Sequence, residues 1–333
     1  MAFVKQKDVR KADWREMAPW PVASAGPADG QKEKIAGRPP ALKGKRLADR
    51  RPWPTLLGRV QRIPFSLSLQ RWSFAVLVPK TCLIGHTGFV GGALGRQFPF
   101  DEGFNSGSFR SMAGQEFSLA VCCGVSAVKW RANQDPDGDR AAIRALAGVL
   151  ETVRADRFIL ISTVDVYPVP FRVDEGSGCR ERQNHAYGTN RLEFEETVRG
   201  LFPRALILRL PALFGAGLRK NVVYDLLHGN CLDSVNPASS FQWYDVARLW
   251  GDIQVAEYAG EELVNLVTEP VTTGEIIDRV FPGAVAGAAA GAPQAYDVRT
   301  RHAAAFGGTG GYVAGRAECL DRLAAFVAAE RGA

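Results

Sequence analysis

The chain has 333 residues, of which 46% are hydrophobic and 23% are charged. These fractions are typical of a globular protein and exclude a collagen-like, coiled-coil or wholly disordered chain. No apolar run reaches the roughly 18 residues that a membrane-spanning helix needs, so we expect neither a transmembrane segment nor a membrane partner.

The net charge of +6 is distributed unevenly along the chain. Residues 1–77 contain 16 basic and 6 acidic side chains, whereas residues 78–333 contain 25 basic and 29 acidic ones. The basic character therefore belongs to the first segment, and the overall charge does not indicate a body that binds nucleic acid.

Residues 1–77 also hold 8 of the 19 prolines and show little regular hydrophobic periodicity. A linker or tail is one interpretation of such a segment. A basic arm that touches an anionic partner is a second. A third is upstream sequence read in frame, because Val78 stands just before a nucleotide-binding pattern and GTG codons can initiate translation in bacteria. On any of these readings we expect residues 1–60 to pack little against the body.

The cysteines form neither a C-x-x-C pair nor a metal-ligand spacing with the four histidines. In a chain of this size they do not resemble a disulfide framework. We expect no metal site and a reducing, cytoplasmic setting. The six cysteines are Cys82, Cys122, Cys123, Cys179, Cys231 and Cys319.

From Lys80 onward, apolar strand patterns alternate with helical ones, which predicts an α/β fold with a parallel sheet between helices. We expect a Rossmann-like, doubly wound core over residues 78–215 and a small substrate-binding part, interleaved with it, over 216–333. The expected strands are Lys80–Gly85, Ser118–Cys123, Arg157–Ser162 and Ala205–Leu210, and the expected helices include Asp139–Arg154, Tyr187–Leu201 and Arg316–Glu330.

A glycine-rich turn joins the first strand to the first helix. Gly85 permits the tight turn, Gly88 lets the backbone approach a pyrophosphate, and Gly91 allows the helix to pack closely on the strand. The free N–H groups of the helix N-terminus would then face the phosphates. An ordinary tight turn is the alternative. Three residues of the same turn are assigned to the cofactor site with the glycines: Thr87, Phe89 and Val90.

Two further segments carry candidate chemistry. The strand that ends in Ser162 and Thr163 presents hydroxyls where parallel sheets bind ligands, although both could instead be structural caps. Tyr187 and Arg191 stand four residues apart on one predicted helix face. A phenol beside a fixed cation can have its pKa lowered, which would make Tyr187 an acid/base group.

The motifs GHTGFVG, ISTVDVY and YGTNR, in this order and at these separations, resemble the extended short-chain dehydrogenase/reductase family, in particular the NAD-dependent epimerase/dehydratase group. Much of that group acts on nucleotide sugars. The segments RLPALFGAG and FQWYDVARLW fit the same resemblance, which covers about residues 80–330 and leaves out residues 1–77.

The resemblance implies a role for several residues. Thr163 would hold a substrate oxygen, Tyr187 would be the catalytic acid/base and Pro211 would lie beside the nicotinamide. Asp165 falls where dehydratases of the group place a glutamate, so it is assigned to the substrate. Gly124, which follows the second expected strand, is assigned to the cofactor.

The sequence also departs from the family pattern. Arg191 replaces the usual lysine, which keeps the positive charge but loses the ability to pass a proton. Val164 replaces a dehydratase aspartate and has no proton to give. The interval between Gly91 and Ser118 has room for one brief strand near Phe104 and a turn of helix, so we expect the sheet to lack one peripheral strand.

The cofactor is predicted to be NAD or NADP. Asn105 and Ser106 lie where an NAD-specific site often carries an acid that binds the ribose, and no acid is present there. Arg110 could instead meet a 2′-phosphate, which favours NADP.

On the substrate side, Arg219 and Asn221 stand at a predicted helix entrance and suit a diphosphate or a carboxylate, unless they form a solvated basic turn. Gln242 and Trp243 would line a sugar site or pack between the two parts of the chain.

Two functions stay open at this point: an NAD(P)-dependent oxidoreductase or epimerase for a nucleotide sugar or similar alcohol or carbonyl, and a dinucleotide-binding sensor or scaffold that has lost turnover. A homodimer is a further expectation of the resemblance.

Overall fold

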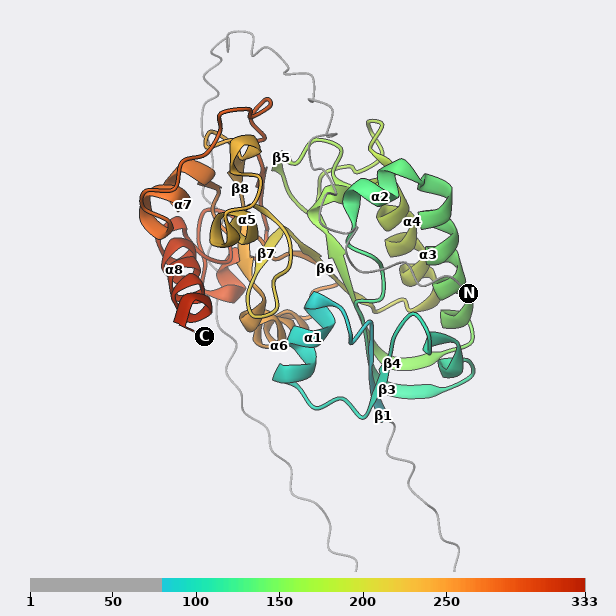
Figure 1. The fold of residues 1–333 in the computed structure, drawn as a ribbon. Coiled ribbons are helices and arrows are strands. Elements are labelled where there is room, and N and C mark those ends of the chain that lie inside the picture. The colour runs from blue at the N-terminus through green and yellow to red at the C-terminus, as the bar shows by residue number, and fades with distance from the viewer. Residues whose placement is uncertain (1–79, 333) are drawn as a thin grey trace, which may run out of the picture. The chain divides into compact units, whose positions relative to one another are not determined.

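The computed structural model describes residues 80–332, which belong to one compact unit. Its centre is a six-stranded, fully parallel sheet in the order β10-β6-β4-β3-β1-β2 (Figure 1). The predicted α/β class is therefore confirmed. The sheet strands are β1 Lys80–Ile84, β2 Glu102–Phe104, β3 Glu116–Cys122, β4 Arg154–Thr163, β6 Leu206–Leu210 and β10 Leu263–Asn265.

Helices cover both faces of this sheet, because successive strand residues point to opposite faces and both faces are apolar. Cys82 and Ile84 pack with α3 and α4, whereas Leu83, between them, packs with α1 and α6. The four helices are α1 Phe89–Gln97, α3 Pro136–Leu150, α4 Ala186–Leu201 and α6 Leu249–Ala259.

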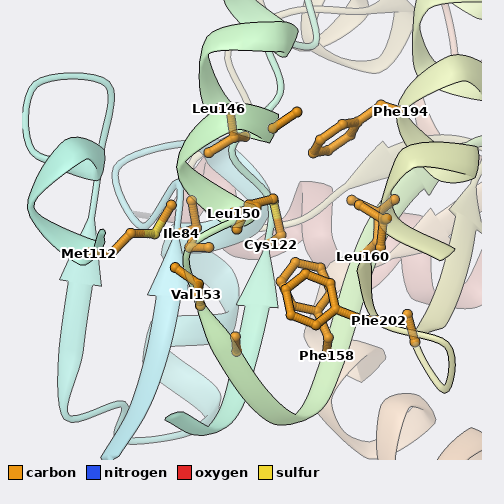
Figure 2. Packing of buried hydrophobic residues seen from close by; sticks show 14 of the residues in the cluster. Ile84, Met112, Cys122, Leu146, Leu150, Val153, Phe158, Leu160, Phe194 and Phe202 are labelled. Carbon is orange, nitrogen blue, oxygen red and sulfur yellow. The ribbon is translucent and has the colours of Figure 1, made fainter. Parts of the chain in front are cut away.

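The core between the sheet and the α3–α4 layer is drawn in Figure 2. Leu146 and Leu150 of α3 and Phe194 of α4 face the sheet. Below them, Phe158 of β4 stacks on Phe202, with ring centroids 4.1 Å apart. The stack joins the middle of β4 to the residue that ends α4. It thereby fixes the far end of the helix that carries Tyr187.

The chain between α1 and β3 forms only one strand, β2. The sheet therefore lacks the further peripheral strand of the family pattern, as the short interval after Gly91 predicts. β2 and β3 both pair with β1, one on each side, and the chain between them forms only the single turn η3, Phe109–Met112. Among residues 80–332, β2 is thus the edge strand of the sheet.

A third apolar cluster is formed largely by helices that lie at one side of the sheet (Figure 1), and a smaller fourth cluster surrounds Tyr167. The helices of the third cluster are α5 Val222–His228, α7 Thr273–Val280 and α8 Arg316–Gly332. Three two-stranded pairs tie this part together, formed by β5 Phe171–Val173 with β12 Asp297–Val298, β7 Ala212–Phe214 with β9 Trp243–Asp245, and β8 Ser240–Phe241 with β11 Val271–Thr272.

The helix expected over Asp139–Arg154 is α3, Pro136–Leu150, so both of its expected ends are wrong. α3 ends at Leu150 rather than Arg154, because the Thr152 hydroxyl bonds the Val149 carbonyl and the chain then turns into β4. Arg154 pairs with Glu116 as the first residue of β4. At the predicted helix entrance, α5 begins at Val222, and Asn221 is its N-cap.

The short α2, Lys129–Gln134, was not foreseen. In the described part of the chain, no helix is both long and apolar enough to cross a membrane. The expectations for residues 1–77 concern a segment outside the described residues.

Candidate active site at the carboxyl edge of the sheet

The residues assigned to the cofactor come together because parallel strands end at the same edge. Ile84 pairs with Phe104 on one side and with Cys122 on the other, so the residues that follow all three strands are neighbours. Thr163 pairs with Leu210 one strand further on. The sheet therefore brings to one edge Gly85, Asn105, Gly124, Thr163 and Pro211.

Packing alone requires two of the three glycines. Gly85 has φ of 86°, and a Cβ there would lie 2.5 Å from the Cys123 carbonyl oxygen. A Cβ on Gly91 would lie 2.2 Å from the Gly85 carbonyl oxygen. Any side chain at either position would push α1 away from the sheet. These two glycines set the close approach of helix and strand.

Gly88 differs from the other two. It has an extended φ of −77°, and a Cβ there would meet only the Gly85 carbonyl oxygen, at 3.3 Å. Gly88 and Thr87 are exposed, and no side chain caps the α1 N-terminus that begins at Phe89. This end of α1 is open on the side where Val90 and its neighbours offer backbone N–H groups. The turn leaves room for an anion, and its contact with a pyrophosphate stays a prediction.

Tyr187 reaches the same edge from the first turn of α4. Its backbone N–H donates to the Asn133 Oδ1 of α2 at 2.9 Å. Its phenol is buried and lies near enough to the Thr163 side chain, at the end of β4, for that side chain to lower the Tyr187 pKa. The two hydroxyls that the sequence motifs single out are therefore adjacent.

The neighbouring hydroxyls also have structural roles. The Thr163 Oγ1 accepts from the Asp165 backbone N–H at 3.1 Å and so caps the turn η4, Val164–Val166. The Ser162 hydroxyl donates to the buried Glu195 carboxylate at 2.5 Å. The Arg209 guanidinium forms an ion pair with the same carboxylate, with its Nη2 2.6 Å from the Glu195 Oε2. Ser162 thus belongs to an ion-pair network inside the protein.

The pKa of Tyr187 results from opposing influences. Burial raises it, the positive charge of Arg191 lowers it, the negative charge of Asp165 raises it again, and Lys129 and the Thr163 side chain lower it. The sum leaves the pKa of Tyr187 above its ordinary value. The phenol is protonated at neutral pH and is suited to donate a proton.

Arg191 is enclosed rather than open to a ligand. Its two terminal nitrogens donate to both oxygens of Asp139, at 2.6 and 2.9 Å, and also to the carbonyls of Ser126 and Tyr187. The guanidinium carbon lies 3.8 Å from the centre of the Tyr187 ring. Arg191 therefore fixes the ring in place. A contact with a cofactor ribose, which stays a prediction, requires one of these bonds to open.

A second ion pair, which the motifs did not indicate, lies near enough to Tyr187 to act on its pKa. The Lys129 Nζ donates to the Asp165 Oδ1 at 2.9 Å and to the Tyr296 hydroxyl at 3.3 Å. The Tyr296 hydroxyl in turn donates to the same Asp165 oxygen at 2.9 Å. The only sequence signal for Lys129 is its rarity, since from residue 78 onward lysine occurs only at Lys80, Lys129 and Lys220.

The remaining predicted contacts concern the substrate. Arg219 is exposed in the loop before α5. The Asn221 side chain caps α5 through the Tyr224 N–H and donates to the Leu213 carbonyl. Gln242 is buried, and its amide bonds the Thr268 carbonyl and both backbone groups of Val298. Asn221 and Gln242 thus hold loops in place, and their contact with a substrate stays a prediction.

The predicted ribose-binding positions lie in a tight turn after β2. The Asn105 Oδ1 accepts from the Gly107 N–H at 2.8 Å, and Ser106 is exposed beside it. Arg110 is exposed and lies over the Phe109 ring, with its guanidinium carbon 4.8 Å from the ring centre. An exposed cation at this end of the edge is compatible with either dinucleotide.

No family model matches the sequence, and no curated protein does so either. Solved structures do match the fold. One is MoeE5 in complex with UDP-glucuronic acid and NAD, at a TM-score of 0.60, with 16% identity over 76% of this chain and 99% of that one. A second is the UDP-glucose 4-epimerase of Thermotoga maritima, at 0.57, with 12% identity over 76% and 98%.

A third is the dTDP-4-dehydrorhamnose reductase of Bacillus anthracis in complex with NADP, at a TM-score of 0.59, with 16% identity over 75% of this chain and 98% of that one. The chain thus has the fold of the NAD-dependent epimerase/dehydratase group, and the resemblance predicted from its motifs is confirmed at the level of the fold.

Proposed function

We propose that the protein is an NAD(P)-dependent oxidoreductase or epimerase that acts on a nucleotide sugar or a similar polar alcohol or carbonyl. The observation that carries the proposal is the contact between Tyr187 and Thr163 at the edge where the open glycine turn also lies. The fold neighbours support it, since their descriptions name NAD or NADP and UDP-linked sugars.

The residues present fit a dinucleotide. The absent Cβ of Gly88 and the uncapped start of α1 leave room and donors for a pyrophosphate, with Thr87 and the backbone of Val90 beside them. Gly124 and Pro211 would flank the rest of the cofactor, because each follows a neighbouring strand end. When bound, the nicotinamide would accept or return a hydride.

The side chains of this protein would handle the proton. In the reduction direction, Tyr187 would give its proton to the substrate oxygen as the hydride reaches the carbon. In the oxidation direction, Tyr187 would first lose its proton to solvent, and the phenolate would then take the proton of the substrate hydroxyl as the hydride leaves the carbon. Thr163 would hold the same oxygen by a hydrogen bond. Arg191 would keep the Tyr187 ring in register through the stacking and the bond to the Tyr187 carbonyl. Burial of these groups would strengthen each interaction.

The experiment begins with cofactor binding. NADH and NADPH are titrated separately into the pure protein while nicotinamide fluorescence is followed, and UDP-glucose and dTDP-glucose are then tested for conversion with the cofactor that binds. We expect binding of at least one dinucleotide and conversion of a nucleotide sugar. If neither dinucleotide binds, the proposal is wrong. If one binds and no sugar is converted, the catalytic half of the proposal is wrong and a dinucleotide-binding module remains.

A further inference from the structure

Two cations act on Tyr187. Arg191 stacks on its ring, and Lys129 stands on α2 one helical turn before Asn133, which binds the Tyr187 backbone N–H. The two differ in their access to solvent. Arg191 and its partner Asp139 have side chains that are 5% and 11% exposed, and the guanidinium makes four hydrogen bonds. Lys129 and its partner Asp165 are 21% and 18% exposed. The second pair is therefore more accessible to solvent than the first, which is enclosed by the protein.

Both hydrogen bonds to Asp165 in the second pair end on one carboxylate oxygen. Asp165 Oδ1 accepts from both the Lys129 Nζ and the Tyr296 hydroxyl, at 2.9 Å each, and these two donors are 3.3 Å apart. One carboxylate thus offsets the lysine charge. A hydroxyl or a cation that binds this carboxylate would draw its charge away from Lys129.

We propose that Lys129 is a positioning residue for the acid/base Tyr187 and that Asp165 opposes its effect. The ammonium stabilises the ionised phenol. The Asp165 carboxylate weakens this stabilisation until a polar ligand binds the carboxylate. This inference rests on the function proposed above, since it assumes that Tyr187 handles a proton. It couples the arrival of a hydroxyl-bearing substrate to the ease with which Tyr187 ionises.

The charges around Tyr187 agree with this arrangement. Burial sets its pKa high, and among the nearby charges Lys129 acts in the same direction as Arg191, whereas Asp165 acts against both. His185, at the start of α4, has its pKa lowered to about 4 by burial and by Lys129, so it carries no charge at neutral pH. Burial lowers the pKa of Lys129, whereas Asp165 and Tyr296 raise it. Their combined influence is the larger, so the pKa lies above its ordinary value and the ammonium stays charged.

A titration of Tyr187 tests the proposal without any substrate. The tyrosines are labelled with an NMR-active carbon isotope at Cζ, the carbon that bears the hydroxyl. Their seven signals are followed by NMR as the pH is raised. The signal of Tyr187 is the one that Tyr187→Phe removes. Circular dichroism at each pH shows the range over which every variant stays folded.

The two members of the pair should act with opposite sign. Lys129→Met should move the ionisation midpoint of Tyr187 to higher pH, and Asp165→Asn should move it to lower pH. Lys129→Arg, which keeps the charge, should stay closer to the wild type than Lys129→Met does. The matched control is Lys80→Met, at the opposite end of β1, which should change nothing.

Midpoints that move in the same direction in both variants, or in neither, overturn the proposal. If Lys129→Met does not fold, Lys129→Gln, which retains a donor to Asp165, replaces it. In a converting enzyme, Lys129→Met should also lower kcat by about tenfold and shift its pH profile. Shifted midpoints without conversion of any sugar would contradict the proposed function alone, whereas conversion with unshifted midpoints would contradict only this inference.

Discussion

Tyr187 is held by interactions that its sequence motif indicates only in part. The spacing of Tyr187 and Arg191 predicts that both lie on one helix face, and the stacking of the guanidinium on the ring agrees with this. The sequence does not reveal that Asp139 binds the guanidinium, because this contact depends on how α3 packs against α4. Lys129 was missed for the same reason, since it reaches the site from α2, outside every motif.

A substitution at Gly88 tests the glycine turn at the scale of one residue. Gly88→Val places a branched side chain where a pyrophosphate would approach but where the protein itself leaves space. We expect NADH or NADPH to bind at least about tenfold more weakly, about 1.4 kcal/mol, by calorimetry. Gly148→Val, at a helix position with open space around it, is the control and should bind normally. Equal affinities in both variants would make the turn purely structural.

The buried ion pair of Arg191 gives a second prediction at this scale. Arg191→Met leaves the Asp139 carboxylate without its partner and should lower the free energy of unfolding by about 3–5 kcal/mol. Denaturant unfolding measures the loss. Arg219→Met, at an exposed arginine, should cost far less. Adding Asp139→Leu to Arg191→Met should recover part of the stability, and a double variant no more stable than Arg191→Met would contradict this account.

At the scale of elements, the strands were easier to predict than the helix boundaries. The apolar runs that become β1, β3, β4 and β6 are visible because both faces of a parallel sheet are buried. The end of α3 was misplaced by four residues, since the turn that stops it depends on the Thr152 hydroxyl. The start of α7 could have been predicted, because Thr272 and Glu275 have the spacing of a capping box and form one there.

The N-cap of α4 yields a prediction about pH. The His185 Nδ1 accepts from the Gly188 N–H at 3.0 Å, which requires an unprotonated nitrogen. Burial, then the charge of Lys129, lowers the pKa of His185 from 6.5 to about 4. Because the folded pKa lies below the unfolded one, the unfolded chain takes up the proton first, and the stability from this cap is lost as pH falls from about 6.5 towards 4.

His185→Asn keeps an N-cap acceptor that does not titrate. Between pH 7 and pH 5 it should therefore lose less unfolding free energy than the wild type, by about 1 kcal/mol. Urea unfolding at the two pH values measures the difference. An equal loss in both proteins would show that the cap does not depend on the ionisation of His185.

At the scale of the whole molecule, the order of motifs predicted the fold because GHTGFVG and ISTVDVY lie at strand ends of one parallel sheet, and YGTNR opens the helix α4 that packs on it. The missing strand was also predictable, since chain length between Gly91 and Ser118 limits what can form there. The C-terminal part was not, because its short strand pairs join segments far apart in sequence, such as Val173 with Val298. Long-range pairing of this kind leaves no local pattern.

The described residues form four apolar clusters, whereas residues 1–77 have a basic, proline-rich composition that is poorly suited to forming a core. We therefore expect that deleting residues 1–77 leaves the thermal unfolding midpoint nearly unchanged. Differential scanning calorimetry of the full chain and of residues 78–333 makes the comparison. A large fall of the midpoint would mean that the first segment contributes to the stability of the fold.

The role of Tyr187 is tested most directly by comparing turnover of the wild type with that of Tyr187→Phe, using the dinucleotide and nucleotide sugar found in the binding and conversion assays. Tyr258→Phe, at a tyrosine that is 95% exposed, is the matched control. We predict that Tyr187→Phe binds the dinucleotide as the wild type does but loses at least about a hundredfold in kcat, because the proton has no acceptor. Full activity of Tyr187→Phe would contradict the account whatever the substrate.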